Sequence, residues 1–98
     1  MMKAQQMVNS RGNVVNNQFV LTDGAVTVFQ SYMSVIAEVN RELKTIKIFE
    51  DYDYSNTTQK YRNLFFAKYV NMLGLASKAD LDRAIKKGVY GDYTVEMA

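Results

Sequence analysis

Alternating apolar and polar positions dominate the first half of the chain and predict a small β-sheet. Residues 5–49 are rich in Val, Ile, Phe and Thr, which favour strands. Asn, Ser and Gly gather at 9–13, which predicts a turn. Asp23-Gly24 separates two apolar runs and predicts a hairpin with a type I′ turn, in which both residues have positive φ. Alternation over Thr45–Phe49 predicts a half-buried strand.

The segment from Ser31 to Lys44 fits two different elements. A helix over 31–44 would align its apolar residues on one stripe; these are Tyr32, Val35, Ile36, Val39 and Leu43. A strand through Ser34–Val39 would instead place alternate residues on one face, with a polar turn at 40–42. Periodicity favours the helix and leaves the strand as the alternative.

Two helices are predicted in the second half of the chain. The first covers Asn56–Leu73, with an N-cap at Ser55, Asn56 or Thr57 and Gly74 ending it. Its apolar positions form two adjoining ridges: Tyr61, Phe65, Tyr69 and Met72, beside Phe66, Val70 and Leu73.

The second predicted helix covers Lys78–Lys87 and has suitable residues at both ends. Ser77 is the expected N-cap, Asp80 lies at the positive end, and Gly88 is the expected left-handed residue after the last turn. An alternating tail over 93–97 predicts a return strand.

The predicted fold class is therefore α+β: a small antiparallel sheet of three to five strands, followed by two helices and a C-terminal return strand. A chain of 98 residues is expected to fold as a single domain, 1–98, around one core.

Composition excludes several function classes. The chain has no Cys, His, Trp or Pro, which removes Cys-His and Ser-His-Asp catalysis, His/Cys zinc sites and disulfides. The formal net charge of +2 is too small to indicate a partner. No apolar run has the ~20 residues of a membrane span. We expect a protein that is not an enzyme, binds no cofactor and contacts no membrane.

The most unusual segment is the connector between the last predicted sheet strand and the first helix, residues 50–62. Asp51 and Asp53 lie on one side if the segment is extended, and would suit Mg²⁺ or Ca²⁺. No third carboxylate is indicated, so the favoured interpretation is that Tyr52 and Tyr54 pack beneath the helix while residues 55–58 cap it.

Basic residues of the first helix suggest a second candidate surface. Lys60, Arg62 and Lys68 lie near tyrosines, an arrangement used to bind single-stranded nucleic acids. The tyrosines fall on the apolar arc of the helix, however, so they are expected in the core. This arc is wider than one packing face needs. Either the C-terminal helix buries the apolar arc, or the arc of helix 57–73 supports self-association. Arg62 lies inside the arc, so its charged group must pair or extend to solvent.

Several segments together resemble a small domain family of unknown function from tailed phages and prophages. The resemblance lies in Asn9-Ser10-Arg11-Gly12-Asn13, Asn17-Gln18-Phe19-Val20, Phe29-Gln30-Ser31-Tyr32 with Ser34 and Ile36-Ala37, and Asp53-Tyr54-Ser55 with Thr57-Thr58 and Lys60-Tyr61-Arg62. It implies an antiparallel sheet followed by helices, favours the strand over 34–39, and assigns no activity. Tyr52 departs from the family pattern, in which tryptophan is common.

We therefore expect a non-enzymatic phage accessory protein that binds a host or phage protein, such as a host-takeover or anti-defence factor, in the bacterial cytoplasm. A minor virion protein and a nucleic-acid-binding protein are the alternatives. The candidate binding residues are Asp51, Tyr52, Asp53, Tyr54, Lys60, Arg62 and Lys68.

Overall fold

The computed structural model describes residues 3–98 and places seven strands in one mixed sheet with the order β1-β2-β3-β4-β5-β7-β6. The strands are β1 (Lys3–Val8), β2 (Val14–Asp23), β3 (Val26–Ser31), β4 (Ser34–Asn40), β5 (Thr45–Ile48), β6 (Val89–Tyr90) and β7 (Tyr93–Met97). The helical segments are η1 (Glu50–Asp53), α1 (Asn56–Leu64), η2 (Phe65–Tyr69), η3 (Leu73–Leu75) and α2 (Lys78–Lys87).

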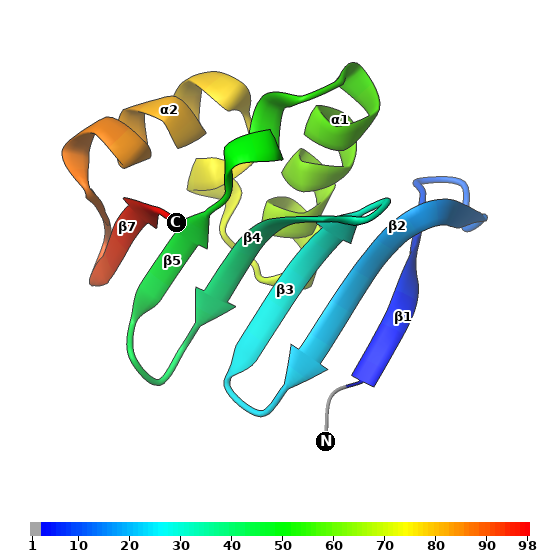
Figure 1. Cartoon of the computed structure of the whole chain (residues 1–98), viewed down its shortest axis with the longest axis horizontal. Helices are drawn as coiled ribbons and strands as arrows, with labels where there is room; N and C mark the ends of the chain where they lie inside the picture. The colour runs from blue at the N-terminus through cyan, green and yellow to red at the C-terminus, as the bar shows by residue number, and fades with distance from the viewer. Residues whose placement is uncertain (1–2) are drawn as a thin grey trace.

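Both α-helices cover the same face of the sheet (Figure 1). The core lies between these layers because alternate residues of β2 to β5 and β7 point toward the helices. Phe65 is fully buried, and its ring centroid lies 5.6 Å from that of Phe29 on β3 and 5.3 Å from that of Phe66. The aromatic cluster joins the sheet to the segment that follows α1.

The predicted hairpin at Asp23-Gly24 is confirmed, but its turn differs. Asp23 is the last residue of β2 and pairs with Val26, so the turn residues are Gly24 and Ala25. Gly24 has φ of 58°, whereas Asp23 stays extended within the strand. A type I′ turn with Asp and Gly at its centre was therefore the wrong prediction.

The segment predicted as either a helix or a strand contains a strand, β4. It lies between β3 and β5, and Ile36, Ala37 and Val39 are buried. A shift in register near Phe29 indicates a bulge, which explains why the consecutive residues Ile36 and Ala37 are both buried. Pairing on both edges of β4 outweighs the helical periodicity.

The first helix is shorter than predicted. α1 is followed by a π-helical segment, η2, in which Val70 N–H donates to Phe65 O. Asn71 has the left-handed φ of 58° that was predicted for Gly74, and Gly74 lies in η3 instead. Ser55 caps α1, since its hydroxyl accepts the Thr58 N–H.

The apolar arc predicted over residues 57–73 is largely buried within the chain. The buried members are Tyr61, Phe65, Phe66, Val70 and Met72, while Leu73 is 72 % exposed. They pack in the core that also contains sheet residues and Leu81 of α2. This burial accounts for the width of the arc without self-association.

The C-terminal third matches its prediction closely. Ser77 caps α2, Asp80 lies in its first turn, and Gly88 has φ of 77° after its last turn. The return strand is β7, which pairs in parallel with β5. The α+β class is confirmed, but the sheet is mixed and larger than the predicted three to five antiparallel strands.

Candidate functional site

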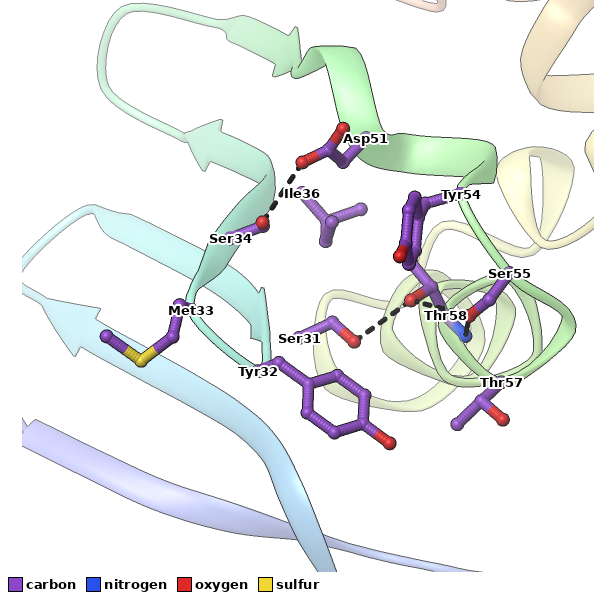
Figure 2. A pocket seen from close by; sticks show the side chains of 10 residues that line it. All are labelled: Ser31, Tyr32, Met33, Ser34, Ile36, Asp51, Tyr54, Ser55, Thr57 and Thr58. Carbon is purple, nitrogen blue, oxygen red and sulfur yellow. Dashed lines mark hydrogen bonds between the residues drawn. The ribbon is translucent and has the colours of Figure 1, made fainter.

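An open cleft of about 630 Å³ lies where the β3–β4 turn faces the connector and the start of α1. Figure 2 shows side chains from both sides of the cleft around the apolar side chain of Ile36. The lining residues are Ser31, Tyr32, Met33, Ser34, Ile36, Asp51, Tyr54, Ser55, Thr57 and Thr58. The cleft thus combines hydroxyl, aromatic and apolar groups with one carboxylate.

Hydrogen bonds tie the two walls of the cleft together. The hydroxyls of Ser31 on β3 and Thr58 on α1 lie 3.1 Å apart and are buried. Ser34 Oγ donates to Asp51 Oδ2 at 3.0 Å, which links β4 to η1 (Figure 2). Because these contacts join distant parts of the chain, the shape of the cleft is set by the folded structure.

Tyr32 occupies an unusual backbone conformation at the rim of the cleft. Its φ is 56°, which is strained for a bulky residue. Its N–H donates to Asn17 O at 2.6 Å, and its own carbonyl accepts a hydrogen bond from Gln30 Nε2 at 2.9 Å. These contacts hold Tyr32 in a conformation of a kind that often occurs at functional sites.

We expect Tyr32→Gly to raise the free energy of unfolding by about 1 kcal/mol, because glycine adopts positive φ without strain. Chemical denaturation measures this change. The matched control is Met33→Gly at the adjacent position, which is 93 % exposed and has no positive φ. That substitution should lower stability by about 0.5 to 1 kcal/mol. Equal losses in both variants would contradict the assignment of strain to Tyr32.

The metal hypothesis required an extended connector, but residues Glu50–Asp53 form the 3₁₀ segment η1. Asp51 lines the cleft, whereas the carbonyl of the exposed Asp53 accepts a hydrogen bond from Gln59 Nε2. Within residues 3–98 no group of three or more His, Cys, Asp or Glu side chains is arranged to hold a metal ion. The extended segment on which the hypothesis relied is therefore not formed, and Asp51 lines the cleft whereas Asp53 does not.

Arg62 anchors the connector from within the core. Its side chain is fully buried; Nη1 donates to Tyr52 O at 2.7 Å and Nη2 to Asn63 Oδ1 at 2.9 Å. Burial lowers the pKa of Arg62, although a guanidinium remains protonated at neutral pH. Arg62 is thus a positioning residue for the segment that forms one wall of the cleft.

Tyr52 extends this anchor to α2. Its hydroxyl donates to Asp82 Oδ1 at 2.8 Å, and Lys78 Nζ lies 2.8 Å from Asp82 Oδ2. Burial, together with the bond to Asp82, raises the pKa of Tyr52. The Lys78 ammonium holds the pKa of Asp82 below its ordinary value. The connector is therefore fixed to both helices.

The predicted basic residues do not belong to the cleft. Lys60 lines a second groove with Arg11 of the β1–β2 loop, and its Nζ lies 5.4 Å from the ring centroid of Tyr61. Tyr61 is buried, and the Tyr69 hydroxyl accepts the Val8 N–H. The tyrosines are thus core residues, as expected, while Lys68 is exposed on η2.

Of the predicted binding residues, Asp51 and Tyr54 lie in the cleft. Tyr52 packs against the core, but Tyr54 is 79 % exposed, so the prediction that it packs beneath the helix was wrong. The β3–β4 residues that complete the cleft were not predicted as site residues; they are Ser31, Tyr32, Met33, Ser34 and Ile36. Four of these five were quoted in the resemblance. The resemblance was therefore the one sequence signal that pointed to these residues. Because the sequence did not decide whether residues 31–44 form a helix or a strand, it could not predict that these residues face the connector.

The fold and cleft define a small α+β protein with an open groove at one end of its sheet. A model of the family of unknown function DUF8033 matches residues 2–83, and the chain belongs to this family. No curated protein and no solved structure shows significant similarity to it. In the part of the chain that the structure describes, no helix has the length and apolar character to span a membrane.

Proposed function

We propose that the chain is a non-enzymatic accessory protein that acts by binding another protein through the cleft. The observation that carries this proposal is the exposure of large side chains at its rim: Tyr32 is 51 %, Tyr54 79 % and Met33 93 % exposed. Tyrosine and methionine are enriched at protein interfaces. Folding leaves these three side chains available to a partner.

The rigidity of the cleft also supports binding. The β3–β4 turn is held through Tyr32 and Gln30, and the connector is held by Arg62. A surface that is already ordered loses less conformational entropy when a partner binds. The strained backbone of Tyr32 supports the proposal, because it holds the aromatic ring at a defined position on the rim of the cleft.

The resemblance to phage and prophage domains supports the biological setting of the proposal. We propose a host-takeover or anti-defence factor in the bacterial cytoplasm. A virion protein would instead be recovered in purified particles, so quantifying the chain in particles and in infected cells separates these roles.

We expect Tyr54→Ala to weaken partner capture at least about tenfold, the loss typical when an interface aromatic that matters for binding is truncated. The measurement is affinity capture from nuclease-treated lysate of phage-infected bacteria at high salt, followed by quantitative mass spectrometry. The matched control is Leu43→Ala in the β4–β5 turn, which removes another exposed side chain, 70 % accessible. Capture by Tyr54→Ala equal to that by the wild type would contradict the proposal.

Nucleic-acid binding is the second candidate function, and the groove that contains Lys60 and Arg11 favours it. It predicts that Lys60→Glu combined with Lys68→Glu abolishes binding to single-stranded oligonucleotides and that affinity falls steeply with salt. Fluorescence anisotropy measures both effects. Oligonucleotide binding that persists unchanged in the double variant would exclude this function for the helix.

A further inference from the structure

The charge of the cleft differs from that of the chain as a whole. The chain has a formal net charge of +2, yet Asp51 is the one charged side chain among the described lining residues. Glu50 and Asp53 lie beside it on η1 and are exposed. Asp51 therefore gives the cleft a negative charge, whereas Glu50 and Asp53 do not line it.

The Asp51 carboxylate is oriented and still able to accept further hydrogen bonds. Ser34 Oγ donates to Oδ2 at 3.0 Å, which fixes the carboxylate beside the cleft (Figure 2). A carboxylate offers about four acceptor sites, so this contact leaves capacity for a ligand. A positively charged donor makes the strongest such hydrogen bonds.

Aromatic and apolar groups surround the space next to this carboxylate. Figure 2 shows Tyr54 from the connector and Tyr32 from the β3–β4 turn on different sides of Ile36, whereas Met33 extends away from them. Tyrosine rings attract lysine and arginine cations. The long methylene stems of those side chains also pack on apolar surfaces. The exposed rings of Tyr32 and Tyr54 supply such a surface, because Ile36 itself is buried.

An anionic ligand fits the cleft less well. The start of α1 faces the cleft and carries a partial positive charge. However, the Thr58 N–H already donates to Ser55 Oγ at 3.1 Å, and the Thr58 hydroxyl lies 3.1 Å from that of Ser31. These groups already have partners within the chain. An anion would also lie near the Asp51 carboxylate, which would repel it.

We infer that the cleft recognises a lysine or arginine side chain presented by a segment of the partner protein. The cation contacts Asp51, and the stem lies between the rings of Tyr32 and Tyr54. This inference rests on the proposed function, because it names the chemistry of the partner at the same site.

Selecting a surface-display library of random linear peptides for binding to the full chain tests the inference. Wild-type protein is expected to enrich peptides with Lys or Arg at one fixed position beside apolar residues. Replacing that residue by norleucine, which keeps an apolar stem without the charge, should weaken binding about tenfold or more.

Asp51→Asn should weaken binding of the selected basic peptides by about tenfold or more and remove most of its salt dependence. The matched control is Asp92→Asn, in the β6–β7 turn, where the carboxylate is 74 % exposed and lies 3.6 Å from Lys44 Nζ. This control should bind like the wild type. Circular dichroism and denaturation verify that both variants are folded.

Two different outcomes separate the inference from the proposed function. Peptides that depend on Tyr54 but show no preference for Lys or Arg would overturn the basic-side-chain inference and leave protein binding through the cleft intact. Selected peptides that bind Tyr54→Ala as well as they bind the wild type, or no enriched peptides at all, would count against both.

Discussion

Arg62→Ala is expected to lower the free energy of unfolding by about 3 kcal/mol or more. The substitution empties the space of a fully buried side chain and removes the hydrogen bonds to Tyr52 O and Asn63 Oδ1. Truncation of a large buried residue typically costs about 2 to 5 kcal/mol, and the partly buried Tyr52 carbonyl, left without this partner, adds to the cost. Relief of the desolvation of a buried charge offsets part of the loss.

Urea denaturation of Arg62→Ala, Arg62→Met and Arg83→Ala separates these contributions. Arg62→Met keeps most of the side-chain volume, so its loss of stability should be smaller than that of Arg62→Ala and reports mainly on the missing hydrogen bonds. Arg83 on α2 pairs with Asp80 at 2.9 Å and has a side chain that is 61 % exposed, so its replacement should change stability by less than about 0.5 kcal/mol. A similarly small change for Arg62→Ala would refute the role of Arg62 as the anchor of the connector.

Gln18→Met is expected to raise the free energy of unfolding by about 1 to 2 kcal/mol. Gln18 on β2 is fully buried, and neither Nε2 nor Oε1 has a hydrogen-bond partner among residues 3–98. A buried polar group without a partner costs about 1 to 3 kcal/mol. Methionine has nearly the same shape and carries no strong hydrogen-bonding group, so the penalty disappears while the packing is kept.

The matched control is Gln6→Met on the neighbouring strand β1, where the side chain is exposed. It should change stability by less than about 0.5 kcal/mol. Thermal and urea denaturation of both variants provide the comparison. A loss of stability in Gln18→Met would show that the amide has a stabilising hydrogen-bond partner in solution, and Gln18→Leu would test that result independently.

Most elements that depend on local chemistry were predicted accurately, although Gly74 was wrongly predicted to end the first helix. The caps at Ser77 and Gly88 are confirmed, and Ser55, one of three predicted alternatives, caps the first helix. Each satisfies backbone groups within a few residues of itself. The hairpin at Gly24 has the same local origin, although its turn is shifted by one residue. Propensity and capping are readable from sequence since their partners are near in the chain.

Elements that depend on distant partners were predicted less well. The apolar residues over 31–44 do have helical spacing in the sequence. The strand β4 forms there nevertheless, because β3 and β5 pair with its two edges. The extent of the first helix was overestimated, because its apolar pattern continues to Leu73 although the helical segment η2 ends at Tyr69. Periodicity indicates which residues are buried but does not determine the backbone that buries them.

The candidate site divides in the same way. The unusual connector with Asp51 and Tyr54 was recognised from sequence, and both residues line the cleft. Arg62 was predicted to pair or to extend to solvent; its bond to Tyr52 O shows that it pairs. The opposite wall, with Tyr32, was missed because a turn and a connector come together only when β3, β4 and α1 pack.

The sequence by itself determined the α+β class, the positions of most turns and caps, and the exclusion of cysteine and histidine chemistry. These properties follow from composition and from interactions between residues close in the chain. The tertiary structure alone decided the parallel pairing of β7 with β5, the burial of Arg62 and the formation of the cleft. Each of these requires segments far apart in sequence to lie side by side, and the free energy of that packing is not encoded in any single local pattern.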